Sequence, residues 1–198
     1  MGAVVMTRCK QLKLQRQLVK GMTLIEILIT LTIIGLASLI ALPALSEFTV
    51  KTRVDAEVIE LQRFLITARN AAINSGKQVT VCPLSNGACT NGWKNQLTIF
   101  VNENDNNNYN AANEQIVKIK ADISSDDIIK FTGGATLVYS PTGRLIGGNN
   151  VAFTYCPKNY NALARGVNIA LSGRAYLTQD TDNDGKDEDR NGNELNCT

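Results

Sequence analysis

A single carboxylate stands at the head of a long apolar run. Glu26 is the last charged residue before the uncharged stretch 27–46. A charge inside lipid is unfavourable by roughly 2.5–3.5 kcal/mol near the centre of a helix, so an ionisable group beside such a run indicates function and needs a partner. If the chain is cut after Gly21, the new α-amine of Met22 lies four residues from Glu26 on the same helical face. That amine, from the same subunit or a neighbour, can neutralise the Glu26 carboxylate.

The C-terminal tail holds a second pattern with chemical potential. Asp180, Asp182 and Asp184 alternate along the chain and are followed by Gly185. This is the first half of a calcium-binding loop, in which alternate oxygens converge on one ion and glycine allows a sharp turn. The tail therefore contains a candidate calcium site.

The second half of this loop departs from the calcium pattern. Lys186 can offer its backbone carbonyl, and Glu188 a carboxylate or a bridged water. The twelfth position is Asn191 instead of the usual bidentate glutamate, which weakens affinity or moves the last ligand to Asp187 or Asp189. The alternative interpretation is a solvated acidic turn.

Two arginines near the predicted last hairpin are candidates for contact with DNA. Arg165 and Arg174 lie close in the sequence to Tyr155, Tyr160 and Tyr176. Arginine can bind phosphate and tyrosine can stack on bases. The acidic tail beside them would repel a polyanion.

Composition limits the other function classes. The 198-residue chain has a formal net charge of +2, and removal of residues 1–21, with five basic and no acidic residues, would change this charge to −3. Such a chain does not have the broadly basic surface of a protein that coats nucleic acid. The absence of His removes Ser–His and Cys–His nucleophile pairs and His-ligated zinc sites. Since no nucleophile motif is present, we expect that the chain is not an enzyme.

The cysteines indicate export. Cys9 lies in the basic N-terminal segment, and Cys82, Cys89, Cys156 and Cys197 remain as an even number. Of the three connectivities that four cysteines allow, we favour a short Cys82–Cys89 loop and a Cys156–Cys197 bond that pins the tail. The alternative, a zinc site built from four thiolates, lacks the usual closely spaced cysteine pairs.

A long helix is expected to precede the rest of the fold. Residues 22–46 are predicted to form a transmembrane helix, because about 20 residues at about 1.5 Å each span a bilayer core. Residues 47–76 continue it as an amphipathic helix that stops at Gly76. The apolar stripe of this part, at spacings of four and three, consists of Val54, Val58, Leu61, Leu65, Ala68 and Ala72.

The remainder, 77–198, is predicted to be a β-rich globular domain with a disulfide-pinned C-terminal tail. Short β runs separated by turn residues are expected near 78–82, 97–101, 115–120, 128–131, 136–139, 151–156, 166–171 and 174–178. Ser172-Gly173 is predicted to turn the last hairpin. The fold class is therefore α+β, with one long N-terminal helix on a mainly antiparallel sheet.

Residues 20–26, Lys-Gly-Met-Thr-Leu-Ile-Glu, resemble the class III signal of type IV pilins and pseudopilins. The resemblance implies that residues 1–21 are a leader, which prepilin peptidase removes by cutting between Gly21 and Met22. It also implies N-methylation of Met22 and a role in filament assembly for Glu26. Most pilins begin with Phe, so Met22 is a departure.

Landmarks in the globular part resemble the FimT/FimU and GspH branch of minor pilins and pseudopilins. These landmarks are Cys82-Pro83, Gly92-Trp93, the 97–101 strand, Glu114, the 153–156 strand and Ser172-Gly173-Arg174. The branch implies a pilin fold and a minor subunit that helps to initiate or cap a type IV pilus or a type II secretion pseudopilus. An alternative is a DNA-uptake receptor at a pilus tip, although Tyr176 replaces the second arginine of the Gly-Arg-x-Arg motif.

The same resemblance implies where the chain resides and what it meets. A single span in the bacterial inner membrane would leave the globular domain in the periplasm, and assembly would move it into a pilus or pseudopilus. The expected partners are other major and minor pilins or pseudopilins, prepilin peptidase, inner-membrane lipid and, in the alternative, DNA. Calcium is the one candidate cofactor.

Overall fold

The computed structural model describes residues 21–104, 106 and 108–197. The chain divides into two compact units, Met1–Pro43 and Ala44–Thr198. The helix α1 (Leu24–Ser75) begins in the first unit and ends in the second. It corresponds to the helix predicted over 22–76. Most of the predicted leader, 1–20, lies outside the described residues.

The part of α1 in the first unit is apolar and exposed. Among the described residues no single helix is both long and apolar enough to cross a membrane by itself, whereas the bent pair Leu24–Leu39 and Ala44–Ser75 meets the length and composition requirements together. The predicted span, 22–46, covers the first member of that pair.

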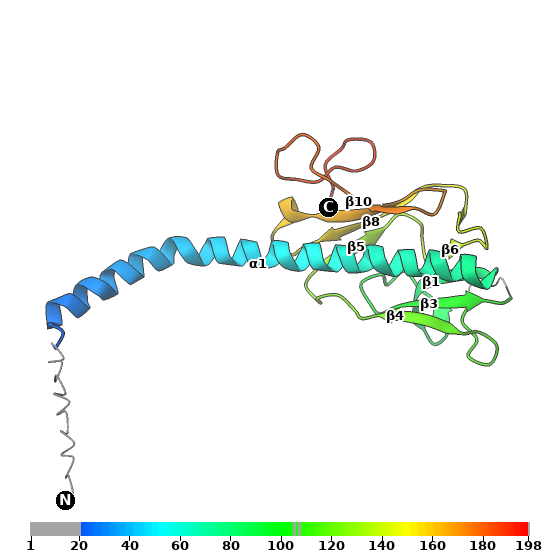
Figure 1. The fold of residues 1–198 in the computed structure, drawn as a ribbon, viewed down its shortest axis with the longest axis horizontal. Coiled ribbons are helices and arrows are strands. Elements are labelled where there is room, and N and C mark those ends of the chain that lie inside the picture. Colours follow the sequence, from blue (N-terminus) through cyan, green and yellow to red (C-terminus); the bar gives the residue numbers. More distant parts are fainter. Residues whose placement is uncertain (1–20, 105, 107, 198) are drawn as a thin grey trace, which may run out of the picture. The chain divides into compact units, whose positions relative to one another are not determined.

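Ten strands follow α1 in the described part of the second unit, several of which Figure 1 labels. They are β1 (Gln78–Ser85), β2 (Ala88–Cys89), β3 (Leu97–Asn102), β4 (Ile116–Lys120), β5 (Ile128–Phe131), β6 (Leu137–Tyr139), β7 (Leu145–Ile146), β8 (Val151–Cys156), β9 (Arg165–Ile169) and β10 (Ala175–Leu177). The eight predicted strands are all present, with shifts of a few residues at their ends. The two-residue strands β2 and β7 were not predicted.

The strands form two antiparallel sheets. One has the order β4-β3-β1-β6-β7, with β2 paired to β1, and the other has the order β10-β9-β8-β5. In the first sheet Val79 pairs with Val101 of β3 and with Tyr139 of β6. In the second, Phe153 pairs with Val167 of β9 and with Phe131 of β5. This α+β arrangement confirms the predicted fold class.

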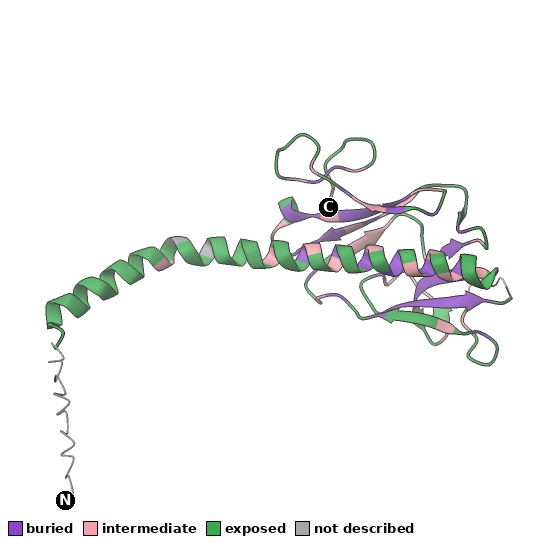
Figure 2. Cartoon of the chain, viewed as in Figure 1, coloured by how far each residue is buried: buried purple, intermediate pink, exposed green. Residues whose placement is uncertain are grey.

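The hydrophobic core lies where α1 meets both sheets. All six residues of the predicted apolar stripe are buried, with at most 3% of their surface exposed. They join one cluster with alternating residues of the strands, including Val79, Val81, Val167 and Ile169. Figure 2 shows buried residues along the helix segment that runs beside the strands. Phe64, also buried, lies beside the stripe and was not predicted.

Several ion pairs join the polar flanks of α1 to the sheets. Arg53 Nη2 lies 3.0 Å from Asp127 Oδ2, and Lys120 Nζ lies 2.7 Å from Glu57 Oε2. The side chains of Asp127 and Lys120 are almost fully buried. Because a buried charge without its partner is strongly unfavourable, these pairs fix how the helix sits on the sheets.

Tight turns complete the packing around the end of α1. Gly76 follows the helix with φ 66°, and its N–H donates to Ala72 O at 3.1 Å, as expected for a glycine that ends a helix. Gly173, with φ 77° in the turn between β9 and β10, lies so close to the Gly143 carbonyl that a Cβ would collide with it. Arg69 of α1 donates to the same carbonyl at 3.0 Å.

Candidate functional site

The predicted cleavage point lies in an exposed, non-helical segment. Gly21, Met22 and Thr23 precede α1, and all three are exposed. Exposed chain outside regular structure is a preferred place for proteolysis, and the bond between Gly21 and Met22 lies in such a segment.

Glu26 takes part in a contact that was not predicted. The Glu26 N–H donates to Thr23 Oγ1 at 3.3 Å, and the Thr23 N–H donates to Glu26 Oε2 at 3.5 Å. This reciprocal pattern is a capping box, which satisfies two backbone donors at the start of a helix. The signal was available, since Thr23 and Glu26 have the spacing Thr-x-x-Glu. Glu26 therefore starts the helix as well as carrying a charge.

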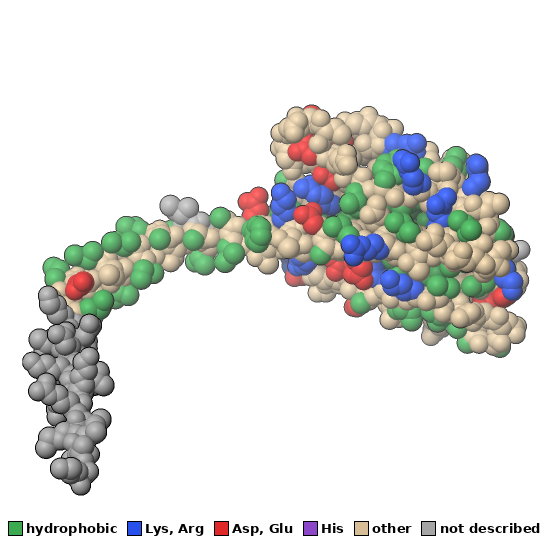
Figure 3. Space-filling model, in the orientation of Figure 1, with side chains coloured by type: hydrophobic (Ala, Val, Ile, Leu, Met, Phe, Trp, Pro, Cys, Tyr) green, Lys and Arg blue, Asp and Glu red, His purple; other side chains and the backbone are tan. Residues whose placement is uncertain are grey.

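The surface of α1 after Glu26 is hydrophobic. Figure 3 shows hydrophobic side chains covering the first part of the helix. Those with at least half of their surface exposed include Leu28, Ile29, Leu31, Ile33, Ile34, Leu36, Leu39, Leu42, Leu45 and Phe48. Exposed apolar surface on this scale marks contact with a membrane or with other proteins.

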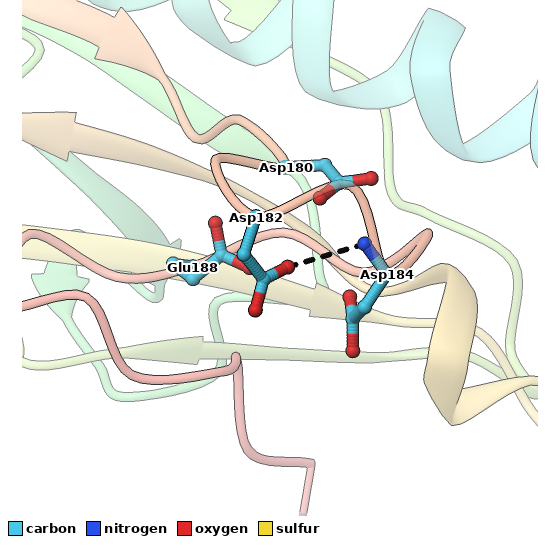
Figure 4. A group of neighbouring side chains, drawn as sticks. All are labelled: Asp180, Asp182, Asp184 and Glu188. Carbon is cyan, nitrogen blue, oxygen red and sulfur yellow. Dashed lines mark hydrogen bonds between the residues drawn. The ribbon is translucent and has the colours of Figure 1, made fainter.

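Four carboxylates of the tail converge on one point. Asp180, Asp182, Asp184 and Glu188 each offer one oxygen, and these four oxygens lie within 4.8 Å of one another (Figure 4). Backbone N–H groups of the loop donate hydrogen bonds to carboxylates of the same loop. Asp180 accepts from Asn183 N at 2.7 Å and from Gly185 N at 2.9 Å.

The remaining bonds of this loop fix the other acids. The Asp184 N–H donates to Asp182 Oδ1 at 3.1 Å, and the Lys186 N–H donates to Asp184 Oδ1 at 2.9 Å. The bond from the Lys186 backbone is the main cause that lowers the pKa of Asp184. Glu188 Oε2 accepts from both the N–H and the hydroxyl of Thr181, at 2.5 and 2.6 Å.

The structure does not place Asp187 or Asp189 in this group of carboxylates. Asp187 is buried, lies 2.8 Å from Arg165 Nη1 and accepts from the Thr178 hydroxyl at 2.6 Å. Burial raises the pKa of Asp187, while the Thr178 hydrogen bond and Arg165 lower it. Asp189 accepts from Asn193 N at 3.0 Å. Asp187 and Asp189, the two alternatives for the last calcium ligand, are therefore engaged in other contacts of the tail.

The two arginines predicted for DNA do not form one site. Arg165, whose side chain is 17% exposed, pairs with Asp187 and lies 3.4 Å from Asp55 of α1. Arg174 is exposed beyond the other end of β9, with its guanidinium 5.9 Å from the ring centre of Tyr176. Since Arg165 already has two carboxylate partners, it has a structural task. The geometry does not favour a joint phosphate site.

The four cysteines that the structure describes are paired as two disulfides. Cys82 bonds to Cys89, and Cys156 bonds to Cys197, with Cα–Cα distances of 5.5 and 5.7 Å. These are the two pairings that the sequence favoured. The first closes the β1–β2 hairpin, and the second ties the tail to the end of β8. Four thiols used in this way leave no thiolate zinc site among the described residues.

Comparison with known proteins places the globular part in a family. The sequence pattern described as "Type II transport protein GspH" matches residues 57–173, more than half of the chain. The chain belongs to the GspH family. In this GspH-family chain, the pattern described as "Prokaryotic N-terminal methylation motif" matches residues 16–42, which include Gly21, Met22 and Glu26.

A curated relative matches a shorter part of the chain. A fimbrial protein of Pseudomonas aeruginosa is 42% identical over 60 residues, which are 30% of this chain and 38% of that protein. The GspH-family chain thus spans well under half the length of that curated relative.

The type IV minor pilin FimU of Pseudomonas aeruginosa has a similar fold. One crystal form gives a TM-score of 0.53 and 18% identity over 67% of this chain and 92% of FimU. A second crystal form gives 0.50 and 19% identity over 63% and 92% of the two chains. At these identities the likeness concerns the fold alone. The family and these relatives are transport, fimbrial and pilin proteins, not enzymes, which agrees with the sequence prediction.

Proposed function

We propose that this GspH-family chain is a minor pilin or pseudopilin subunit that helps to initiate or cap a filament. The observation that carries this proposal is the combination at the N-terminus. A Gly21–Met22 bond in an exposed segment is followed, four residues later, by a carboxylate at the head of an exposed apolar helix.

The chemistry of the new N-terminus supports assembly through Glu26. Prepilin peptidase would cut after Gly21, and the freed and methylated amine of Met22 would stay positively charged. A carboxylate among apolar side chains gains most from a cation that arrives with a neighbouring subunit, because the surroundings have a low dielectric constant. The charge pair thus favours the addition of one subunit beside another.

The same features support an anchor in the inner membrane before assembly. The apolar part of α1 would lie in lipid as a single span, and the globular domain would lie in the periplasm, where disulfides such as Cys156–Cys197 persist. The partners would be other major and minor pilins or pseudopilins.

Deletion of the gene tests this role. We expect loss of surface filaments, of type II secretion, or of both, with recovery when the intact gene is restored. Electron microscopy of filaments and an assay of secreted proteins distinguish the two systems. A deletion strain with normal filaments and normal secretion would contradict the proposal.

A further inference from the structure

One carboxylate of the acidic group is buried and has an unpaired oxygen. Glu188 is 5% exposed, and its Oε1 has no hydrogen-bond partner among the described residues. Its other oxygen already accepts two bonds from Thr181. Figure 4 shows the Glu188 carboxylate beside that of Asp182. A buried carboxylate oxygen left unpaired is unfavourable, so this atom calls for a positive partner.

The positive charge available nearby does not balance the group. Lys186 Nζ lies 3.4 Å from Asp184 Oδ2, but it lies closer, at 2.7 Å, to Glu194 Oε2, which is outside the group. Among the described residues, the ion pairs bring one ammonium, that of Lys186, to these four carboxylates, and Glu194 competes for it. Negative charges this close repel one another, and a cation bound between them would offset that repulsion.

We propose that the loop 180–188 binds one Ca²⁺ ion through the carboxylates of Asp180, Asp182, Asp184 and Glu188. The positions match the first, third, fifth and ninth of a calcium loop, with Gly185 at the sixth and φ 92°. Lys186 stands at the seventh position, which supplies a backbone carbonyl in such loops. Water completes the six to eight oxygens that calcium takes.

The donor set selects calcium over other metals. Zinc prefers nitrogen and sulfur ligands, whereas the sequence has no His and the four described cysteines are in disulfides. Magnesium demands near-ideal octahedral geometry and keeps most of its water. A loop of carboxylates that lacks the bidentate twelfth ligand suits a weak calcium site of the extracellular kind.

An ion bound to Glu188 would also restrain the contacts of Asp187, the preceding residue, with β9 and α1. Asp187 directly precedes Glu188 and pairs with Arg165. Arg165 also lies 3.4 Å from Asp55 of α1. Fixing Glu188 therefore fixes the stretch that holds the tail on β9 and α1. We expect calcium to raise the melting temperature, because an ion that binds only the folded chain stabilises it.

Calorimetry on the full chain in a nonionic detergent, with its disulfides intact, tests the proposal. Calcium chloride is titrated into the unsubstituted chain and into Asp182→Asn and Asp126→Asn. Asparagine at 182 keeps the oxygen that accepts from Asp184 N, so the turn is retained while one charge is lost. Asp126 is the matched control, since its exposed carboxylate pairs with Lys158 outside the loop.

We expect calcium heat for the unsubstituted chain and Asp126→Asn, at least tenfold weaker binding for Asp182→Asn, and a calcium-dependent rise in melting temperature that Asp182→Asn lacks. Three outcomes would overturn the proposal. They are no heat at about 10 mM calcium, well above the roughly 0.1–1 mM dissociation constants of extracellular modules, equal binding by Asp182→Asn, or equal affinity for magnesium chloride.

Discussion

Two buried tyrosine hydroxyls occupy opposite environments. Tyr155 donates to Asp127 Oδ2 at 2.6 Å, and Asp127 also accepts from Lys158 N at 3.0 Å. The hydroxyl of Tyr139 is buried with no hydrogen-bond partner among the described residues. Burial raises the pKa of both tyrosines, and the hydrogen bond to Asp127 raises that of Tyr155 further. Both phenols are therefore neutral donors at physiological pH, but only Tyr155 has an acceptor.

This contrast predicts opposite results for the same substitution. Tyr155→Phe should lower the free energy of unfolding by about 1–3 kcal/mol, because it removes a donor from a buried carboxylate. Tyr139→Phe should change it by less than about 0.5 kcal/mol or raise it, because no bond is lost. Urea unfolding of the full chain in detergent, followed by the fluorescence of Trp93, measures both. Equal losses for the two variants would contradict this account, because both substitutions keep the ring and differ only in whether a hydrogen bond is lost.

Sequence reasoning predicted both disulfides but missed other residue contacts, some of which local spacing indicates and some of which it does not. The capping box of Thr23 and Glu26 and the Asn86-Gly87 turn, with φ 51° and 82°, depend on neighbours and could have been recognised. The pairing of Arg165 with Asp187 depends on where the tail returns. Local spacing carries no information about that, so the sequence left Arg165 as a candidate for contact with DNA in the alternative function.

At the scale of elements, periodicity was a reliable guide. The spacing of four and three in α1 predicted its buried face, because residues three and four apart lie on the same side of a helix and so pack against the same layer. Strands of three or more residues could be predicted from their β runs. The strands β2 and β7 have two residues each, too few to show an alternation, and the order of strands in each sheet depends on long-range pairing.

The buried face of α1 makes a direct prediction. Leu65 is fully buried. Leu65→Ala should lower the free energy of unfolding by about 2–5 kcal/mol, because it leaves a cavity in the core. Ile66 is the neighbouring control, with 41% of its surface exposed, and Ile66→Ala should cost well under half as much. Urea unfolding of both variants under the same conditions measures the difference. Similar losses would mean that the helix packs through a different face.

At the scale of the whole molecule, the features that support assembly and those that stabilise the fold lie in different units. The first unit carries the motif and the apolar surface, and the second carries the core, the disulfides and the acidic loop. The family could be recognised from the leader motif and the globular landmarks. The choice between a type IV pilus and a type II secretion pseudopilus depends on neighbouring subunits, which one chain does not encode locally.

The central claim is that the charge of Glu26 drives assembly, and its capping role must be separated from that charge. Glu26→Gln removes the charge but keeps an oxygen for the capping box, in which Gln and Glu are both suitable. Thr23→Ala removes the Thr23 hydroxyl that accepts from Glu26 N but keeps the carboxylate. Glu47→Ala removes an exposed acid elsewhere on α1 and is the matched control.

The decisive measurement is the fraction of each variant found in filaments sheared or purified from cells, with cleavage after Gly21 followed by the mass of the mature chain. We predict that all variants are cleaved, that Thr23→Ala and Glu47→Ala are incorporated, and that Glu26→Gln stays in the membrane fraction. Normal incorporation of cleaved Glu26→Gln would contradict the account.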